Sequence, residues 1–225
     1  MTSMEDLQSS SSKTNSRIYE VLRAMLLKGQ LAPGTAIGFR QIAEQLSTSV
    51  MPVREAVHRL VAEGALEIRP NRRLYIPEMT QHRFEQLMRA RILLEPDAAR
   101  QALPHIDSAL LKRIRLEDEI IGEALETKNF ANYMTGNYQF HFLIYRASHS
   151  RVFVNLIESI WLQFAPYMRW VYENYGGSDL ADQHQAACEA ISARDEQRLM
   201  QAIREDIIDG MSLLGSGVLH NQQRT

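Results

Sequence analysis

The chain has 225 residues, a hydrophobic content of 45% and a formal net charge of −2 at pH 7. No apolar run approaches the roughly 18 residues of a membrane-spanning helix, and the N-terminus lacks the basic and then apolar pattern of a secretory signal. The single cysteine excludes an intrachain disulfide. A membrane protein and a disulfide-stapled secreted domain are therefore excluded, and we expect a cytoplasmic protein with no membrane partner.

Charge is distributed unevenly along the chain. Residues 13–76 carry ten Lys/Arg and five Asp/Glu, a balance of +5. Residues 77–225 carry fifteen Lys/Arg and twenty Asp/Glu, a balance of −5, and residues 1–12 add two acids. A basic N-terminal segment on an acidic body indicates a polyanionic partner for the first segment only.

The first expected elements are a polar tail and one helix. Residues 1–14 are polar and Ser-rich, and they predict a disordered tail because so few apolar groups cannot offset the entropy of ordering. Over residues 17–28 apolar side chains recur at helical spacing, and Gly29 suits the C-cap of that helix. Pro33 and Gly34 then predict a turn.

Residues 39–64 predict two short helices joined by a tight turn. The second helix begins near Val50, with Ser49 as its expected N-cap, and Gly64 ends it. The apolar stripes of the two helices consist of Ile42, Ala43 and Leu46, and of Val53, Val57, Leu60 and Val61. The opposite face of the second helix carries Arg54, Glu55, His58 and Arg59.

Two short strand-like segments follow this helix pair. Residues 66–68 and 74–76 are too short for anything but a two-stranded hairpin, whose basic tip is formed by Asn71, Arg72 and Arg73. A closely packed helix pair with a basic outer face and a β-wing is the form of a winged helix-turn-helix DNA reader. We expect this domain to span residues 15–78.

From Thr80 onward the pattern is helical almost throughout. Helices are expected near residues 80–102, 107–127, 129–148, 151–174, 179–193 and 195–214. Pro166 lies inside one of them and is expected to kink it. The sequence therefore predicts a mainly α fold, with an N-terminal winged helix-turn-helix followed by an all-α bundle over residues 79–218.

The string Pro-Val-Arg-Glu-Ala-Val at residues 52–57, followed by Leu60 and by Glu63 and Gly64, resembles the recognition-helix signature of the GntR family of bacterial transcription regulators. With the upstream turn, the wing and the helical body, the resemblance covers residues 16–215. It is to the FadR-type branch, whose helical FCD domain binds a ligand. It implies a DNA-binding regulator, expected to be a repressor, that acts as a homodimer on double-stranded, pseudo-palindromic DNA and responds to a small-molecule effector.

The resemblance also implies which residues contact DNA. Where the family usually has Arg and then Thr, this chain has Val50 and Met51, and an apolar side chain there could meet a thymine methyl group. Arg73 stands where a glycine is common, and it adds charge for a phosphate or a minor groove. The alternatives are a salt bridge on the same helix for Arg54 and a solvated tip for the wing. The expected DNA-binding residues are Arg40, Ser49, Val50, Met51, Arg54, His58, Arg59, Arg72 and Arg73.

Four positions match the metal site of the FadR-type domain. Asn137 and His141 are i, i+4 on one expected helix, His184 opens another, and Asp206 stands where the last histidine is expected. Two imidazoles and one carboxylate could hold one Zn²⁺, Mn²⁺ or Ni²⁺, whereas Asn137 offers only a neutral carbonyl oxygen. The alternative is a site that has lost its metal and keeps polar groups around a pocket.

Arg91 occupies the position that reaches toward the effector in the family. A guanidinium beside a metal suits a carboxylate, which points to a carboxylate metabolite. The alternative is a helix-surface pair between Arg91 and Glu95. The expected effector-binding residues are Arg91, Glu95, Asn137, His141 and His184. Cys188 is expected to be a buried, inert thiol.

One expected helix is rich in aromatic side chains. They are Trp161, Phe164, Tyr167, Trp170, Tyr172 and Tyr175. The simpler interpretation is that these side chains pack in the core or at a dimer interface. The more specific interpretation is that they line a pocket for the effector.

Two other functions would fit parts of the sequence. One is a small all-α metal-dependent enzyme that uses His141, His184 and Asp206, with the N-terminal domain as an accessory. The other is an architectural DNA-binding protein without an effector. The sequence contains no HExxH motif and no phosphate-cradling glycine loop, so we expect a protein that is not an enzyme.

Overall fold

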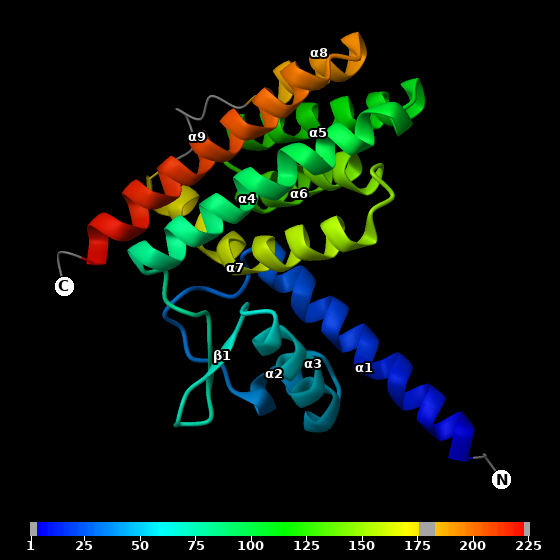
Figure 1. Ribbon diagram of the computed structural model, residues 1–225. Helices are drawn as coiled ribbons and strands as arrows, with labels where there is room; N and C mark the ends of the chain where they lie inside the picture. Colours follow the sequence, from blue (N-terminus) through cyan, green and yellow to red (C-terminus); the bar gives the residue numbers. More distant parts are fainter. Residues whose placement is uncertain (1–3, 176–182, 223–225) are drawn as a thin grey trace.

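The chain folds into a helical body and a smaller N-terminal head, and the long first helix of the head extends up to the body (Figure 1). This computed structural model describes residues 4–175 and 183–222. The head contains α1 (Met4–Leu27), α2 (Phe39–Gln45), α3 (Val50–Ala62), β1 (Glu67–Ile68) and β2 (Leu74–Tyr75). The described body contains α4 (Gln81–Ala102), a 3₁₀ turn (Leu103–His105), α5 (Ser108–Glu126), α6 (Phe130–Arg146), α7 (Arg151–Tyr175), α8 (His184–Ala193) and α9 (Glu196–Gln222).

The helix pair and the wing form as the sequence predicts. The apolar positions Val53, Val57 and Leu60 of α3 are fully buried. The strands pair antiparallel with Glu67 opposite Tyr75, and a further bridge joins Leu74 to Ile37 ahead of α2. This bridge attaches the wing to the segment that precedes α2, and it fixes the position of the wing relative to the helix pair.

Two expectations for the head are corrected. The disordered tail over residues 1–14 is not found from residue 4 onward, because α1 begins at Met4. A helix already stabilised by packing over its C-terminal half extends at little cost, since each added residue gains a hydrogen bond without new nucleation. Ser49 does occupy the N-cap position of α3 in an extended conformation, but its side chain accepts no capping hydrogen bond.

Short side chains cap several of the body helices. Thr80, Asp107 and Asn129 each accept a hydrogen bond from the backbone N–H three residues later, at the starts of α4, α5 and α6. α7 runs continuously through Pro166, and α4 runs through Pro96. The expected start of a helix near residue 179 lies outside the described residues. No helix of the described chain is long and apolar enough to cross a membrane.

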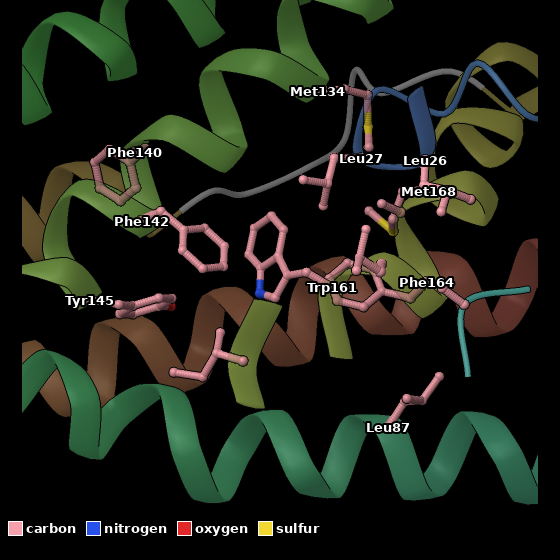
Figure 2. Packing of buried hydrophobic residues seen from close by; sticks show 14 of the residues in the cluster. Leu26, Leu27, Leu87, Met134, Phe140, Phe142, Tyr145, Trp161, Phe164 and Met168 are labelled. Atoms are coloured by element: carbon pink, nitrogen blue, oxygen red, sulfur yellow. The ribbon is translucent and has the colours of Figure 1, made fainter. Parts of the chain in front are cut away.

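A single hydrophobic cluster connects head and body. Leu22 and Leu26 of α1 are fully buried, and they belong to the same cluster as Trp161 and Met168 of α7 (Figure 2). Most of the aromatic side chains on α7 are part of this core: Trp161, Phe164, Tyr167 and Tyr172 are buried. The side chains of Trp170 and Tyr175 lie outside the described set. The head is therefore continuous with the body through α1.

Candidate functional site

The outer face of α3 is exposed and carries most of the expected DNA contacts. Met51 is 67% exposed, and Arg54 and His58 lie on the same exposed side of the helix. The guanidinium of Arg54 lies 5.4 Å from the ring centroid of Phe39 on α2, which supports the side chain without neutralising it. The alternative of a salt bridge for Arg54 is not found among the described residues.

Other expected contacts surround this face. Arg40 and Ser49 are exposed, and Val50 is half-buried because it packs against the core. Arg59 points elsewhere: its guanidinium lies 3.6 Å from the ring centroid of Tyr19 on α1. Arg59 is nevertheless exposed, so a DNA contact for it stays a prediction.

The wing tip is exposed, basic and tightly turned. Asn71 donates to the Tyr75 hydroxyl at 3.0 Å and accepts from the backbone N–H of Arg73 at 3.0 Å. Arg72 has a left-handed backbone with φ of 58°, a conformation that favours glycine. Arg72, rather than Arg73, is thus the strained position of the tip. A further exposed arginine, Arg69, was not expected here and pairs with Glu67 at 2.6 Å.

The C-terminal end of α3 is held by the body. The Glu63 carbonyl accepts from Gln163 Nε2 at 3.1 Å and from Ser159 Oγ at 3.3 Å, both on α7. The Gly64 carbonyl accepts from Arg83 on α4 at 2.7 Å, and Arg83 also donates to Gln163 at 2.8 Å. These bonds satisfy carbonyls that a helix end leaves without intrahelical partners, and they fix the recognition helix to the body.

A polar cavity of about 450 Å³ lies beside this joint. Its walls come from α1, α3 and α7 and include Tyr19, Arg59 and Glu63. Arg23 and Glu158 pair across it at 2.5 Å. Burial opposes ionisation of Glu158, but hydrogen bonds from Arg23, Tyr138 and Arg146 outweigh it and hold the pKa of this carboxyl below its usual range.

The body contains a buried polar centre built from three helices. Nε2 of His141 on α6 lies 3.2 Å from Oδ2 of Asp206 on α9. Nε2 of His184 on α8 lies 3.5 Å from Oδ1 of the same carboxylate. The donor atoms of the three residues all lie within 4.8 Å of one another. The structure thus brings together the three strongest candidate metal ligands, whereas the position of Asn137 as a ligand stays a prediction.

A chain of hydrogen bonds fixes the proton of His141. The Tyr145 hydroxyl donates its only proton to Oε2 of Glu95 at 2.8 Å. It can therefore only accept from Nδ1 of His141, which lies 3.1 Å away. Burial lowers the pKa of His141 despite the opposing effect of Asp206, so the ring is neutral and its single proton lies on Nδ1. The lone pair of Nε2 then faces a carboxylate.

That arrangement fits a divalent metal. Burial would raise the pKa of Asp206, but the charged and hydrogen-bonding groups around it, Arg91 among them, keep it well below its usual range, so the group is a carboxylate. A lone pair facing a carboxylate across 3.2 Å is repulsive unless a cation lies between them. Ligands about 2.0–2.1 Å from a tetrahedral Zn²⁺ lie roughly 3.3 Å from each other, close to both separations found here. Two imidazoles and a carboxylate suit Zn²⁺, Mn²⁺ or Ni²⁺.

Arg91 and Glu95 form the floor of this centre. Arg91 Nε donates to Oε1 of Glu95 at 2.6 Å, and Nη2 donates to Oε2 at 3.2 Å. The Trp161 indole N–H donates to the same Oε1 at 3.1 Å, while the guanidinium lies 4.3 Å from the ring centroid of Phe164. The alternative interpretation of Arg91, an i, i+4 pair with Glu95, is therefore the one found, but the pair is buried rather than on the helix surface.

Two family matches divide the chain at the same place as the structure. Residues 14–76 match the family described as bacterial regulatory proteins, gntR family. Residues 86–209, more than half of the chain, match the FCD domain. The chain belongs to the GntR family. It is a transcriptional regulator with an FCD effector-binding domain.

Individual GntR regulators are similar to this protein along nearly its whole length. The HTH-type transcriptional regulator McbR of Escherichia coli is 26% identical over 196 residues, which cover 86% of this chain and 89% of McbR. The gluconate operon transcriptional repressor of Bacillus subtilis is 23% identical over 213 residues, covering 89% of this chain and 84% of the repressor. The relatives are named as transcriptional regulators, in line with the expectation that the chain is not an enzyme.

Solved GntR structures show the same fold. Escherichia coli McbR/YncC superposes with a TM-score of 0.84 at 25% identity, covering 94% of this chain and 99% of that one. A GntR regulator from Rhodococcus sp. RHA1 reaches a TM-score of 0.73 at 19% identity, covering 91% and 98%. The predicted mainly α fold, with a winged helix-turn-helix and a helical bundle, is confirmed.

Sequence reasoning missed two residues at this buried polar centre. Tyr145 and Asp118 both contact it, and Oδ1 of Asp118 lies 3.3 Å from Nδ1 of His184. Trp161, which was expected in the core, at a dimer interface or at a pocket wall, donates to Glu95 there. The i, i+4 spacing of His141 and Tyr145 was a signal that could have identified Tyr145. Nothing in the local sequence marks Asp118. Cys188 is buried, as expected.

Proposed function

We propose that this GntR regulator is a repressor that binds a pseudo-palindromic operator as a homodimer through the exposed face of α3 and the wing tip. The observation that carries this proposal is the outer face of α3. Met51 and Arg54 project from a helix whose opposite side is fixed in the core, so the face can enter a major groove without rearranging. Arg54 reads a base edge, and Met51 meets a thymine methyl group.

Retardation of the regulator's own promoter DNA tests the assignment of this face. Arg54→Ala should weaken binding by about 1–3 kcal/mol, because a bidentate base contact is lost. Arg59→Ala is the matched control, since Arg59 lies five residues further on the same helix and packs on Tyr19, so we expect its loss to weaken binding less. Equal affinity of wild-type protein and the Arg54 variant would exclude Arg54 as a reader.

We further propose that the FCD centre holds one divalent metal through His141, His184 and Asp206, with the carbonyl oxygen of Asn137 as a weak further ligand. A metal with three protein ligands keeps an open position that can take a carboxylate effector. Arg91 is already bonded to Glu95 on two of its nitrogens, so its role is to keep the floor of the site charged and rigid.

α7 is the proposed link between effector and DNA. It places Trp161 on Glu95 inside the body, and it places Ser159 and Gln163 on the end of the recognition helix. An effector regulates only if it binds one head–body geometry better than the other, and a shift of α7 changes both ends of this link. DNA affinity that is the same with and without Zn²⁺, Mn²⁺ or Ni²⁺ and carboxylates would favour the architectural alternative.

Exposed apolar side chains on the body are candidates for the dimer seam. Val152 and Leu156 lie one turn apart on α7 and are 68% and 50% exposed. Leu116 and Ile120 make a second pair on α5. Sedimentation equilibrium of Leu156→Glu and Leu116→Glu tests both faces, and the seam is the face whose variant becomes monomeric. A monomeric wild type would overturn the homodimer.

A further inference from the structure

Beside His184 lies a partly buried carboxylate that the proposed metal site does not use as a ligand. Asp118 lies on α5, and its Oδ1 is 3.3 Å from Nδ1 of His184. We propose that Asp118 is a positioning residue. It holds the Nδ1 proton of His184 and so turns the lone pair of Nε2 toward Asp206 and the metal. This inference deepens the proposed metal site and rests on it.

The argument starts from the two carboxylates around one imidazole. Asp118 lies at Nδ1 of His184, and Asp206 lies 3.5 Å from Nε2. A neutral imidazole has one proton, which can satisfy only one of the two carboxylates. A nitrogen that binds a metal must have no proton, so the proton has to lie on Nδ1. Asp118 is the group that accepts it there.

Packing fixes the plane of the ring but not the position of its proton. The His184 ring lies 4.1 Å from the Phe140 ring, centroid to centroid, at an angle of 33°. The His141 ring approaches it at 5.3 Å and 73°. Both neighbours restrict rotation of the His184 ring, yet both exert little preference between its two tautomers. Among the described residues, the choice of tautomer therefore depends on the oxygen atoms of Asp118 and Asp206 at the two ends of the ring.

His141 shows the same arrangement with a different residue. Its Nδ1 faces the Tyr145 hydroxyl and its Nε2 faces Asp206. Each imidazole thus has an oxygen atom close to its outer nitrogen, at 3.1 Å for His141 and 3.3 Å for His184, and the shared carboxylate near its inner nitrogen. A metal-binding histidine commonly donates its other N–H to a carboxylate in this way, and loss of that partner typically costs about 10–100-fold in metal affinity.

The test uses the full-length protein and four variants of α5. Asp118→Ala removes the acceptor, Asp118→Asn keeps an amide oxygen in its place, and Glu119→Ala and Glu119→Gln change the exposed neighbouring carboxylate as matched controls. Zn²⁺ affinity is measured at fixed pH by competition with a chromogenic chelator. The ring ¹⁵N shifts of His184 in the metal-free proteins report which nitrogen carries the proton.

Asp118→Ala should lose about 10–100-fold in Zn²⁺ affinity and shift the His184 proton toward Nε2. Asp118→Asn should lose less, because its carbonyl oxygen still accepts the Nδ1–H bond, and this variant also decides the matter if the alanine variant does not fold. The Glu119 variants should match the wild type. Asp118 variants with wild-type affinity and an unchanged tautomer would overturn the role of Asp118 alone. A wild-type protein that binds none of Zn²⁺, Mn²⁺ or Ni²⁺ would instead overturn the metal site itself.

Discussion

The reading face of the head and the polar centre of the body use charged side chains in opposite ways. In the body, Arg91 and Glu95 are 5% and 0% exposed, and the two side chains pair with each other at hydrogen-bond distance. On the head, Arg40, Arg54, Arg72 and Arg73 are exposed, and no ion pair joins them to any described residue. Buried charges must be paired to be tolerated, whereas a cation that is to meet a phosphate or a base is best left hydrated and unpaired.

Breaking the buried pair should give the largest effect. Glu95→Gln leaves the Arg91 guanidinium buried beside a neutral amide, which should destabilise the protein by about 3–5 kcal/mol. Urea unfolding at pH 7 measures the loss. The matched control is Asp97→Asn on the same helix, because Asp97 pairs with Arg100 at 2.8 Å on a partly exposed surface and should cost about 1 kcal/mol or less. Equal losses in the two variants would remove the distinction between buried and exposed charge.

The joint between the two regions comes next in size. Arg83→Met keeps the apolar stem but leaves the Gly64 carbonyl without its donor, at a cost of about 1–3 kcal/mol. The change should leave metal affinity as it is and reduce the effect of metal on operator binding. Titration of promoter DNA with and without Zn²⁺ measures this coupling. Arg89→Met is the control, since Arg89 is exposed on the same helix. An unreduced metal effect in the Arg83 variant would show that coupling takes another route.

A pH series tests whether the ionised carboxylate of Glu158, in the cavity beside this joint, stabilises the fold. The pKa of Glu158 is depressed in the folded protein by its bonds to Arg23, Tyr138 and Arg146. Its ionised form therefore contributes stability that is present above the unfolded pKa of about 4.3 and is lost as pH falls through the lower folded pKa. Glu158→Gln removes this contribution. The stability difference between wild type and variant, from urea unfolding, should narrow as the pH is lowered below that value. A constant difference would mean that the carboxylate charge does not contribute.

The smallest expected effect lies at the wing tip. Arg72→Gly relieves a left-handed backbone, and it should stabilise the fold by roughly 1 kcal/mol while reducing the salt dependence of DNA binding by about one phosphate contact. Arg73→Gly is its control: no left-handed strain is relieved there, so only the DNA contact should be lost. If Arg72→Gly binds DNA as the wild type does, the tip is a solvated surface.

The sequence predicts the helices well because each depends on local periodicity and capping. The ends of α4, α5 and α6 fall within two residues of their expected positions. Thr80, Asp107 and Asn129 are the N-caps that begin these helices, and each is a local feature of the sequence. The tail was predicted wrongly because its composition says nothing of the packed helix to which it is joined.

The site is less accessible to local reasoning. His141, His184 and Asp206 were placed by resemblance, but the network that orients them joins residues 50 and 66 positions apart, such as Tyr145 and Trp161 with Glu95. The helix pattern alone also cannot show that the guanidinium of Arg59 packs on Tyr19 of α1. Both cases depend on which helices meet, and hydrophobic spacing does not encode that directly.

The shared core of α1 and α7 limits how this regulator can be taken apart. Leu26 lies near Met168 of α7 (Figure 2), and Leu22 belongs to the same cluster. A side chain at Gly29 would collide with Arg169 of α7. A hybrid regulator made by exchanging heads at the boundary near residue 78 would join one α1 to a foreign α7. Exchange of operator specificity should therefore keep the native α1 and replace only the exposed face of α3 and the wing tip, because the opposite side of α3 packs on α1.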